Sequence, residues 1–348
     1  MTMNRQFGLL SLEEPLIIAE MSGNHNQSLD RALAIVDAAA EAGVGALKIQ
    51  TYTADTMTLD CKEGEFFIAD PNNLWQGYSL YELYQKAYTP WEWHKPIFDR
   101  CREKGIIGFS TPFDETAVEF LETLNVPLYK IASFELTDLP LIRKVAATGK
   151  PIIMSIGMAT LAEIEEAVET AENNGCRQIA LLKCTSSYPA PPKTSHIRTI
   201  ANLKETFACE VGLSDHTLGV GVAIAAVAMG AALIEKHFTL SRAEGGVDSA
   251  FSLEPAEMRQ LVDETKRACE AMGEVHYGPL AEEMTSRNYR RSLYVAVDIK
   301  RGDRFTKENV RCIRPAFGLA PRHYDRVMGR TAKTDLAKGK ALTWDDIN

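Results

Sequence analysis

The segments Gly212-Leu-Ser-Asp-His216 and Glu235-Lys-His237 share one pattern, a short apolar run that leads to a histidine. The two runs, residues 209–213 and 231–234, have the length and composition of buried strands. If they are neighbours in one parallel sheet, both imidazoles emerge at the same sheet edge, where such sheets carry their chemistry. The two histidines can then hold a divalent metal between them.

Apolar runs of this kind alternate with amphipathic stretches from residue 16 onward, which is typical of repeated βα units. The predicted strands span residues 16–20, 46–50, 107–111, 128–132, 151–155, 179–184, 209–213 and 232–237. Among the predicted helices, residues 28–42 stop at Gly43, and residues 161–174 follow an N-cap at Thr160. Eight strands, each followed by a helix, within about 250 residues predict an α/β fold of the (β/α)₈ TIM-barrel type.

One connection of this predicted barrel is unusually long. Residues 51–106 separate the second strand from the third, and residues 51–80 are rich in Trp, Tyr, Phe, Asn and Gly before a helical run over 80–103. A loop of such length in a compact domain commonly covers a site. We therefore expect this segment to lie over the carboxyl ends of the strands.

The pattern lapses after Gly273, which divides the chain into parts. Residues 1–272 form the predicted barrel, residues 273–288 a polar linker, and residues 289–348 a small, mostly β module. The module has 14 Lys and Arg against 7 Asp and Glu, a charge of +7, whereas residues 1–288 carry −16. Its basic residues are dispersed and lack an aromatic stacking motif, so we expect no nucleic acid as a partner. The module is expected to dock on the acidic body or on an anionic ligand there.

The composition also predicts the cellular compartment of the protein and the state of its cysteines. With 45% hydrophobic and 24% charged residues, the chain is typical of soluble globular proteins. No apolar run approaches the roughly 20 residues that span a bilayer, and residues 1–8 lack a secretory layout, so we expect a cytoplasmic protein without membrane association. The seven cysteines include no Cys-x-x-Cys pair, which argues against a disulfide framework or a thiolate zinc site and predicts buried thiols.

Nearly every predicted strand ends in polar residues, which together predict a polar pocket of mixed charge. These residues are Glu20, Lys48, Gln50, Ser110, Thr111, Lys130, Ser133, Glu135, Ser155, Lys183, Thr185, Ser186, Ser214, His216, Glu235 and His237. A single serine there can simply begin a loop, but lysines and acids inside a barrel rim must be paired or bound to ligand to offset their desolvation. Lys48 and Lys130, with the hydroxyls of Ser133, Ser155 and Ser214, provide a charged seat for a phosphate group.

Two further groups of strand-end residues carry chemistry. His216 and His237 suit Zn²⁺ or Mn²⁺, although a histidine in such a place can equally be a hydrogen-bonded structural residue. Glu20, Glu135 and Asp248 are carboxylates that can serve as base, acid or ligand to a sugar hydroxyl. The spacing of these three carboxylates along the chain does not show which of them has which role.

Motifs along the whole chain resemble the sialic acid synthase family. They are Ile18-Ala-Glu20 with Asn24-His25, Lys48-Ile-Gln50, Phe109-Ser-Thr-Pro-Phe113, Tyr129-Lys-Ile-Ala-Ser133, Cys184-Thr-Ser-Ser-Tyr-Pro189, Gly212–His216 and Glu235–His237. The tail resembles the antifreeze-like (SAF) domain through Asp298-Ile-Lys-Arg-Gly302, Glu308-Asn-Val310 and Ile313-Arg-Pro315. The resemblance implies an enzyme that joins phosphoenolpyruvate to an amino sugar and forms a nine-carbon 2-keto acid.

Within that family, the chain looks closest to the branch that makes pseudaminic acid. Leu74-Trp75, Leu80-Tyr-Glu-Leu-Tyr84, Thr89-Pro90, Glu92-Trp-His94 and Leu182-Lys-Cys184 carry this likeness. The implied substrate is 2,4-diacetamido-2,4,6-trideoxy-L-altrose, and the implied product supplies bacterial surface glycans such as those in flagellin glycosylation. Three alternatives remain open: N-acetylneuraminate or legionaminate synthesis, a metal-dependent barrel aldolase or hydrolase, and a carbohydrate-binding protein with an inert barrel.

The resemblance also implies a role for each matching position. Phosphoenolpyruvate is expected at Lys48, Lys130, Ser133, Ser155, Ser186 and Ser214, where Ser186 replaces an asparagine of the sialic acid enzymes. The sugar is expected at Glu20, Gln50, Thr111, Glu135, Tyr188, Asp248 and Arg314. The implied metal at His216 and His237 is Mn²⁺, with Mg²⁺ or Co²⁺ as alternatives, and it polarises the sugar aldehyde while Glu20 handles a proton. A domain-swapped homodimer is implied, in which Arg314 caps the partner's barrel.

Overall fold

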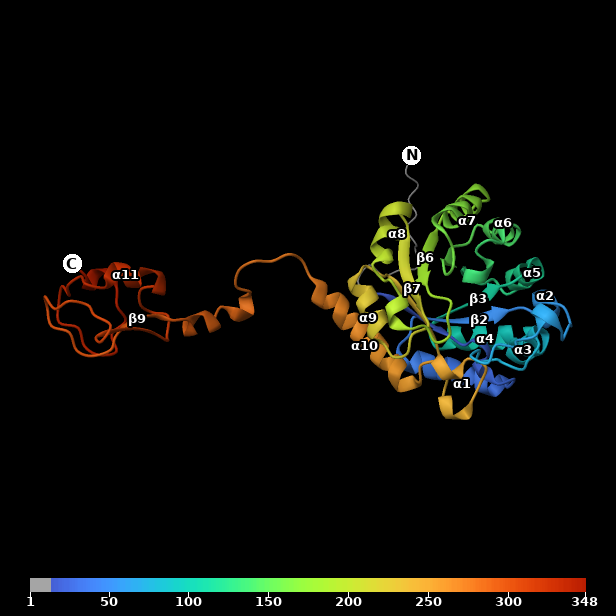
Figure 1. The fold of residues 1–348 in the computed structure, drawn as a ribbon, viewed down its shortest axis with the longest axis horizontal. Coiled ribbons are helices and arrows are strands. Elements are labelled where there is room, and N and C mark those ends of the chain that lie inside the picture. The colour runs from blue at the N-terminus through green and yellow to red at the C-terminus, as the bar shows by residue number, and fades with distance from the viewer. Residues whose placement is uncertain (1–13) are drawn as a thin grey trace. The chain divides into compact units, whose positions relative to one another are not determined.

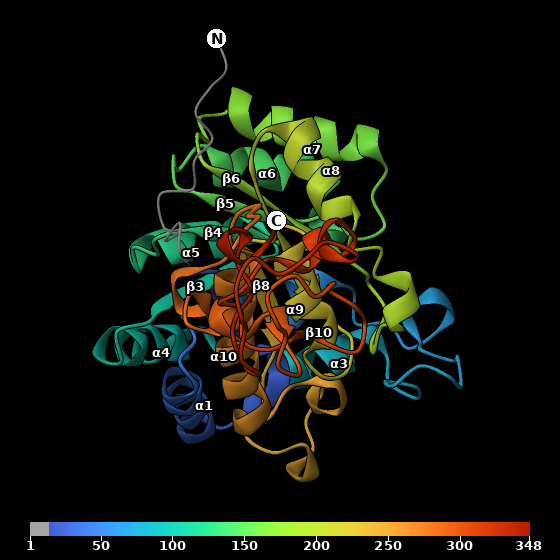
Figure 2. The same cartoon turned by 90° about the vertical axis from the view of Figure 1, so that its left-hand side faces the viewer.

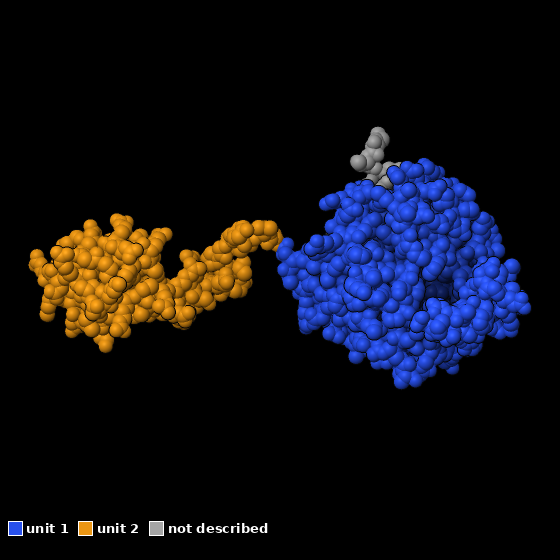
Figure 3. All heavy atoms as spheres, in the orientation of Figure 1, with its two compact units in different colours: residues 1–273 blue, residues 274–348 orange. Residues whose placement is uncertain are grey.

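The computed structural model describes residues 14–348, which fall into two compact units, Met1–Gly273 and Glu274–Asn348 (Figure 3). The first unit contains a closed barrel of eight parallel strands in sequence order, with β8 paired back to β1. The strands are β1 (Leu16–Glu20), β2 (Ala46–Thr51), β3 (Ile107–Pro112), β4 (Tyr129–Ile131), β5 (Ile152–Ser155), β6 (Ile179–Cys184), β7 (Glu210–Asp215) and β8 (Leu233–His237). The predicted TIM barrel is confirmed, and strand ends differ from the predicted ones by at most two residues.

Helices surround this barrel (Figures 1 and 2). They are α1 (Leu29–Ala42), α4 (Trp91–Glu103), α5 (Glu115–Thr123), α6 (Leu139–Ala146), α7 (Leu161–Asn173), α8 (Thr199–Phe207), α9 (Gly221–Ala228) and α10 (Pro255–Met272). Helix α1 stops at Gly43, whose φ of 87° is one that glycine adopts without a Cβ penalty. Helix α7 begins with the capping box of Thr160 and Glu163 that the sequence predicts.

The alternation of side chains along each strand builds two apolar layers. Outward residues such as Leu47 and Ile49 pack against the helices, whereas inward residues fill the barrel. The inward apolar set is Ile18, Ala46, Phe109, Leu128, Ile153, Ala180, Leu182 and Leu233. Two residues further along the strands, the same inward faces carry polar side chains, including Glu20, Lys48, Lys130 and Glu235. The core therefore ends in a polar layer at the carboxyl ends of the strands.

The long connection between β2 and β3 is partly helical. It contains α2 (Ala54–Met57), a short 3₁₀ turn (Gly64–Phe66) and α3 (Leu80–Ala87) before α4. The single helical run predicted over residues 80–103 is wrong, because Tyr88 is extended and Pro90 begins a new helix as its N-cap. A proline disfavours the helical conformation in the residue before it, which separates α3 from α4.

The second unit has its own core. Strands β9 (Ser292–Val295) and β10 (Val310–Ile313) pair antiparallel, and α11 (Tyr324–Val327) follows. Leu293, Phe305, Val310 and Val327 are buried together. Residues 274–291 are exposed and contain two 3₁₀ turns, Ala281–Glu283 and Ser286–Tyr289, ahead of this core.

The predictions about membrane-spanning segments and about buried cysteines concern the whole chain, of which the structure describes residues 14–348. No helix in this range is both long enough and apolar enough to cross a bilayer. All seven cysteines are free thiols; Cys101, Cys176, Cys184 and Cys209 are buried as predicted. The prediction is wrong for Cys61, Cys269 and Cys312, which are half-buried because they lie in a loop, near a helix end and on a two-stranded sheet.

Candidate active site

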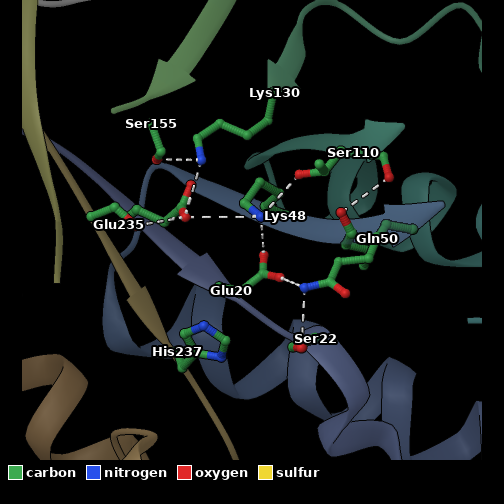
Figure 4. A network of polar contacts seen from close by, with 12 residues as sticks. Glu20, Ser22, Lys48, Gln50, Ser110, Lys130, Ser155, Glu235 and His237 are labelled. Atoms are coloured by element: carbon green, nitrogen blue, oxygen red, sulfur yellow. Dashed lines mark hydrogen bonds and ion pairs between the residues drawn. The ribbon is translucent and has the colours of Figure 1, made fainter. Parts of the chain in front are cut away.

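Four ionisable side chains meet inside the barrel at the level where the apolar core ends. Lys48 Nζ lies 2.8 Å from Glu20 Oε2 and 3.9 Å from Glu235 Oε1, and Lys130 Nζ lies 3.5 Å from the same Glu235 oxygen. Figure 4 shows both lysines reaching toward Glu235 from different strands. All four residues are buried. We call these four residues the ion cluster.

Burial and mutual attraction set the charges of the ion cluster. Burial lowers the pKa of Lys130, and Glu235 offsets this only in part. Burial also opposes ionisation of Glu235, but the attraction of Lys130 and Lys48 outweighs it and lowers the pKa of Glu235. For Glu20 the effect of burial is the stronger one and raises its pKa. Burial also opposes the charge of Lys48, but the attraction of Glu20 and Glu235 outweighs it and raises the pKa of Lys48. Since Glu20 favours its neutral form, the carboxylates leave positive charge on the lysines uncompensated, which suits an anionic ligand.

A chain of hydrogen bonds leads from the ion cluster toward Asp248. Gln50 Nε2 donates to Glu20 Oε1 at 2.9 Å and to Ser22 Oγ at 3.2 Å, and Ser22 Oγ donates to Asp248. On the other side, Lys48 Nζ donates to Thr111 Oγ1 at 3.1 Å. The predicted residues Glu20, Gln50, Thr111 and Asp248 are thus brought together by side chains from β1, β2, β3 and the loop after β8.

Two predicted phosphate residues, Ser155 and Ser214, are hydrogen-bonded to Lys130 and Glu235 of the ion cluster. Lys130 Nζ donates to Ser155 Oγ at 2.7 Å, and Ser214 Oγ donates to Glu235 Oε1 at 3.2 Å. Ser133 Oγ accepts a hydrogen bond from the backbone N–H of Gly157 at 3.0 Å. A Cβ on Gly157 would lie 2.3 Å from Ser186 Oγ and 2.7 Å from Ser133 Oγ. Gly157 therefore lets these two hydroxyls approach each other.

His216 and His237 face each other, as expected for strands that are neighbours. Their ring centroids are 5.4 Å apart, at the carboxyl ends of β7 and β8. His216 Nδ1 lies 2.9 Å from the carbonyl of Thr185, which fixes this nitrogen as a donor and leaves Nε2 with a free lone pair. Buried His237 Nδ1 makes no hydrogen bond within residues 14–348 and lies 3.8 Å from Asp248 Oδ2.

This donor set fits a divalent metal that is also bound by water or substrate. Two imidazole nitrogens are available, and the hydrogen bond from His216 to the Thr185 carbonyl holds the ring in one orientation, as is common for histidines that bind metals. In the described part of the chain, no group of three or more His, Cys, Asp and Glu side chains is close enough to hold a metal alone. The remaining coordination positions would have to come from small molecules, as in catalytic rather than structural sites.

An aromatic wall borders the histidines. The Tyr188 ring centroid lies 4.3 Å from that of His216, 5.3 Å from Phe251 and 6.0 Å from Trp75. Trp75 Nε1 donates to the Val247 carbonyl at 2.9 Å, immediately before Asp248. The long β2–β3 connection therefore contacts the site through Trp75, in agreement with the prediction for this loop.

Glu135 lies in the 3₁₀ turn Ser133–Glu135 after β4, close enough to Lys130 and Lys48 for their charges to affect its titration. Burial is the main effect and raises its pKa to about 7. Its Oε2 atom is buried without a hydrogen-bond partner among residues 14–348. Buried polar atoms are normally paired, so this carboxyl is suited to bind a ligand.

The geometry agrees with comparisons against known proteins. The model of the NeuB family matches residues 35–277, and that of the SAF domain matches residues 290–348. The chain belongs to the NeuB family. Pseudaminic acid synthase from Campylobacter jejuni is 42% identical over 95% of this chain and 96% of its own length. Pseudaminic acid synthase from Helicobacter pylori is 42% identical over 97% of this chain and 98% of its own length.

A solved structure supports the same family assignment. N-acetylneuraminic acid (sialic acid) synthetase from Leptospira borgpetersenii superposes with a TM-score of 0.70 and 32% identity, over 78% of this chain and 90% of that chain. The predicted likeness to sialic acid synthases and the predicted SAF tail are therefore confirmed, and this chain is a synthase of the NeuB family.

One predicted NeuB-family residue lies outside the barrel unit. Arg314 follows β10 in the second unit, where it is exposed. Its predicted role in a partner's active site concerns an assembly and stays a prediction.

Some residues of the site had no predicted role. Glu235 was expected in the pocket, and the structure places it there, but its contacts with the two lysines were not predicted. Ser22, Gly157 and Cys184, whose Sγ lies 3.9 Å from His216 Nδ1, had no predicted place in the site. Glu235 precedes His237 by two residues and so faces the same side of its strand. The same alternation excludes Ser110, expected in the pocket: it is buried outside the barrel, where its Oγ lies 2.6 Å from Thr51 Oγ1.

Proposed function

We propose that this chain is a pseudaminic acid synthase. In this reaction phosphoenolpyruvate, 2,4-diacetamido-2,4,6-trideoxy-L-altrose and water give pseudaminic acid and phosphate. The observation that carries the choice of sugar is the identity of 42% to two full-length pseudaminic acid synthases, against 36% to N,N'-diacetyllegionaminic acid synthase from Campylobacter jejuni. The two lysines of the ion cluster support phosphoenolpyruvate, an anion, as the second substrate.

The phosphate of phosphoenolpyruvate is assigned to the Lys130 side of the ion cluster. Lys130 and Ser155 are already hydrogen-bonded, and Ser133 and Ser186 are close to each other beside Gly157. A lysine with several hydroxyl donors in a buried pocket binds a phosphate dianion strongly, because the charge-assisted bonds form at low local dielectric. Lys48 and Ser214, which lie beside Glu235, are assigned to the carboxylate of the same substrate.

The sugar is assigned to the side of the histidines and the aromatic wall. Gln50, Asp248, Glu135 and Tyr188 offer donors and acceptors for hydroxyl and acetamido groups. A Mn²⁺ ion at His216 and His237, with Mg²⁺ or Co²⁺ as alternatives, would supply Lewis-acid polarisation of the sugar aldehyde. The aromatic wall keeps bulk water away from that carbonyl.

The reaction balances without a redox step. A carbon–carbon bond forms between C3 of phosphoenolpyruvate and the aldehyde carbon, water adds at C2, and the C2–O bond to phosphate breaks. Glu20, bonded to Lys48 and Gln50, is placed to handle a proton at the sugar oxygen or at the attacking water. Its raised pKa, caused by burial, lets it carry a proton at a pH where an exposed glutamate would be ionised.

The test is phosphate release from phosphoenolpyruvate with each candidate sugar. The 6-deoxy diacetamido altrose should be consumed with a kcat/KM at least 100-fold above that for N-acetylmannosamine or for the legionaminate precursor, and chelation should abolish the activity. Preference for N-acetylmannosamine would move the chain to N-acetylneuraminate synthesis. No phosphate release with any sugar would contradict the reaction class, and activity that survives both chelation and His237→Ala would contradict the metal.

The proposal includes a domain-swapped homodimer in which Arg314 reaches the partner's sugar site. The basic second unit and the acidic barrel support such docking by their opposite charges. Arg314→Ala and His237→Ala should each be inactive alone. After subunit exchange, about a quarter of all sites would be intact if the two residues come from different chains, so activity should return. No recovery in a verified heterodimer would refute the swap.

The inert-barrel alternative is disfavoured by the ion cluster. Four buried ionisable groups cost desolvation energy that a purely structural barrel would save with apolar residues. Their retention beside two facing histidines supports catalysis.

A further inference from the structure

A second ionic group lies on the outer side of the barrel wall, directly behind the two histidines. Lys236 Nζ lies 2.7 Å from Asp215 Oδ2, and both side chains are almost completely buried, with exposed fractions of 0% and 2%. Lys236 Nζ also donates to the Thr217 carbonyl at 2.6 Å. The Thr217 N–H in turn donates to Asp215 Oδ1 at 2.9 Å.

The register of β7 and β8 relates this group to the active site. Ser214 pairs with Glu235, and Asp215 pairs with Lys236. His216, just beyond β7, and His237, the last residue of β8, follow these pairs, and their rings meet edge to face with centroids 5.4 Å apart. Because side chains alternate along a strand, the Ser214–Glu235 and His216–His237 pairs face the pocket, and Asp215–Lys236 lies between them on the opposite face.

The contacts of Lys236 enclose the backbone of His216. Lys236 holds the side chain of the preceding residue, Asp215, and the carbonyl of the following residue, Thr217. His216 lies just beyond the end of β7, where its carbonyl accepts a hydrogen bond from the Ala190 N–H at 2.9 Å and no longer takes part in the barrel ladder. Lys236 is itself next to His237 in β8. The Lys236 ammonium group therefore binds the side chain of the residue before His216 and the carbonyl of the residue after it, and Lys236 itself precedes His237.

We propose that Asp215 and Lys236 are positioning residues that set the separation and orientation of His216 and His237 for a divalent metal. The inference rests on the proposed metal-dependent function. Partners of metal ligands outside the coordination sphere typically contribute 10- to 100-fold to metal affinity. The Asp215–Lys236 pair acts on the same histidines from behind, through the backbone.

The decisive variant replaces both partners together. Lys236→Met alone leaves a buried, unpaired Asp215 and is expected to be strongly destabilised. Asp215→Leu combined with Lys236→Met removes both charges, and such apolar replacement of a buried pair is often neutral or stabilising. Because the buried Thr217 N–H and carbonyl both lose a partner in this variant, we expect it to melt below the parent and to bind Mn²⁺ with a dissociation constant raised on the order of 10-fold or more.

Affinity is measured on the full chain by the electron paramagnetic resonance signal of free Mn²⁺, with the metal alone and then with phosphoenolpyruvate. Val168→Ala in α7 is the control, because it loosens buried packing against the helix layer away from β7 and β8. It should lower the melting temperature without changing Mn²⁺ affinity.

The outcomes separate this inference from the proposed function. Weakened Mn²⁺ binding in a double variant that is still folded at the assay temperature supports the positioning role, provided that the likewise destabilised Val168→Ala chain keeps the parental affinity. Parental Mn²⁺ affinity in that variant would overturn it, since the pair would then serve stability alone. An unmodified chain that binds no Mn²⁺ would instead overturn the metal assignment itself, and the inference with it.

Discussion

Glu135→Gln should make the barrel more stable at alkaline pH while it impairs the reaction. Burial raises the pKa of Glu135 from 4.5 to about 7. A carboxyl whose folded pKa lies above its unfolded value binds more protons in the folded state, so its stability contribution is lost as the pH rises. The penalty is absent below about pH 4.5, develops between about pH 4.5 and 7, and is complete above that range.

The magnitude follows from the size of the shift. A difference of about 2.5 pKa units corresponds to about 3 kcal/mol at 1.36 kcal/mol per unit, which is an upper value because Glu135 is only half-buried by surface area. Glutamine carries no charge and avoids this penalty. For a domain of this size, each 1 kcal/mol moves the melting temperature by roughly 2–4 °C. We therefore expect Glu135→Gln to melt several degrees above the parent at pH 8 and close to it at pH 4.5.

The assay is calorimetry of the barrel transition across this pH range, with phosphate release measured in parallel. Glu82→Gln is the matched control, because Lys62 lowers the pKa of Glu82 to about 2 and the sign is reversed. Because glutamine lacks the stabilising charge of Glu82, the Glu82→Gln chain should be less stable than the parent at neutral pH. A Glu135→Gln chain whose melting difference from the parent is the same at pH 4.5 and pH 8 would refute the burial reasoning.

Three further predictions concern the pocket. Gly157→Ala should raise the KM for phosphoenolpyruvate on the order of 10-fold, because its Cβ would lie 2.3 Å from Ser186 Oγ. Gly221→Ala is the control, because a Cβ at Gly221 would have no atom within 4 Å. An unchanged KM in Gly157→Ala would exclude Ser186 and Ser133 from the phosphate site. Trp75→Phe keeps the ring beside Tyr188 but loses the hydrogen bond to Val247, worth about 1 kcal/mol, so the KM for the sugar should rise roughly fivefold while that for phosphoenolpyruvate stays constant. Glu20→Gln should lower kcat at least 100-fold with little change in Mn²⁺ affinity, and wild-type turnover with a full metal site would remove Glu20 from proton handling.

The barrel could be predicted because its signals are local. Each strand is a short apolar run, and each helix repeats apolar residues at three- and four-residue spacing, so element type and order follow from the chain itself. The break that makes the prediction of one helix over 80–103 wrong also has a local cause, since Pro90 disfavours the helical conformation in the residue before it.

The site was predicted in part for a different reason. The parallel barrel brings all strand ends to one edge, so Lys48, Lys130, His216 and His237 could be expected to converge without knowledge of any contact. Motif resemblance added residues in loops, such as Glu135 and Asp248. The partners within the cluster could not be assigned, because Glu235 meets Lys48 and Lys130 across the barrel interior, at sequence separations that no periodicity encodes.

Composition and short motifs were enough to predict the number and order of the strands, the boundary of a basic tail and the family. The structure was needed to show that Thr111 and not Ser110 faces the pocket, that Ser133 and Ser186 lie close together beside Gly157, and that Asp215 and Lys236 form an ion pair behind the histidines. The physical reason is that a one-residue shift in register turns every side chain to the opposite face, so that function here depends on pairing between strands that are distant in the sequence.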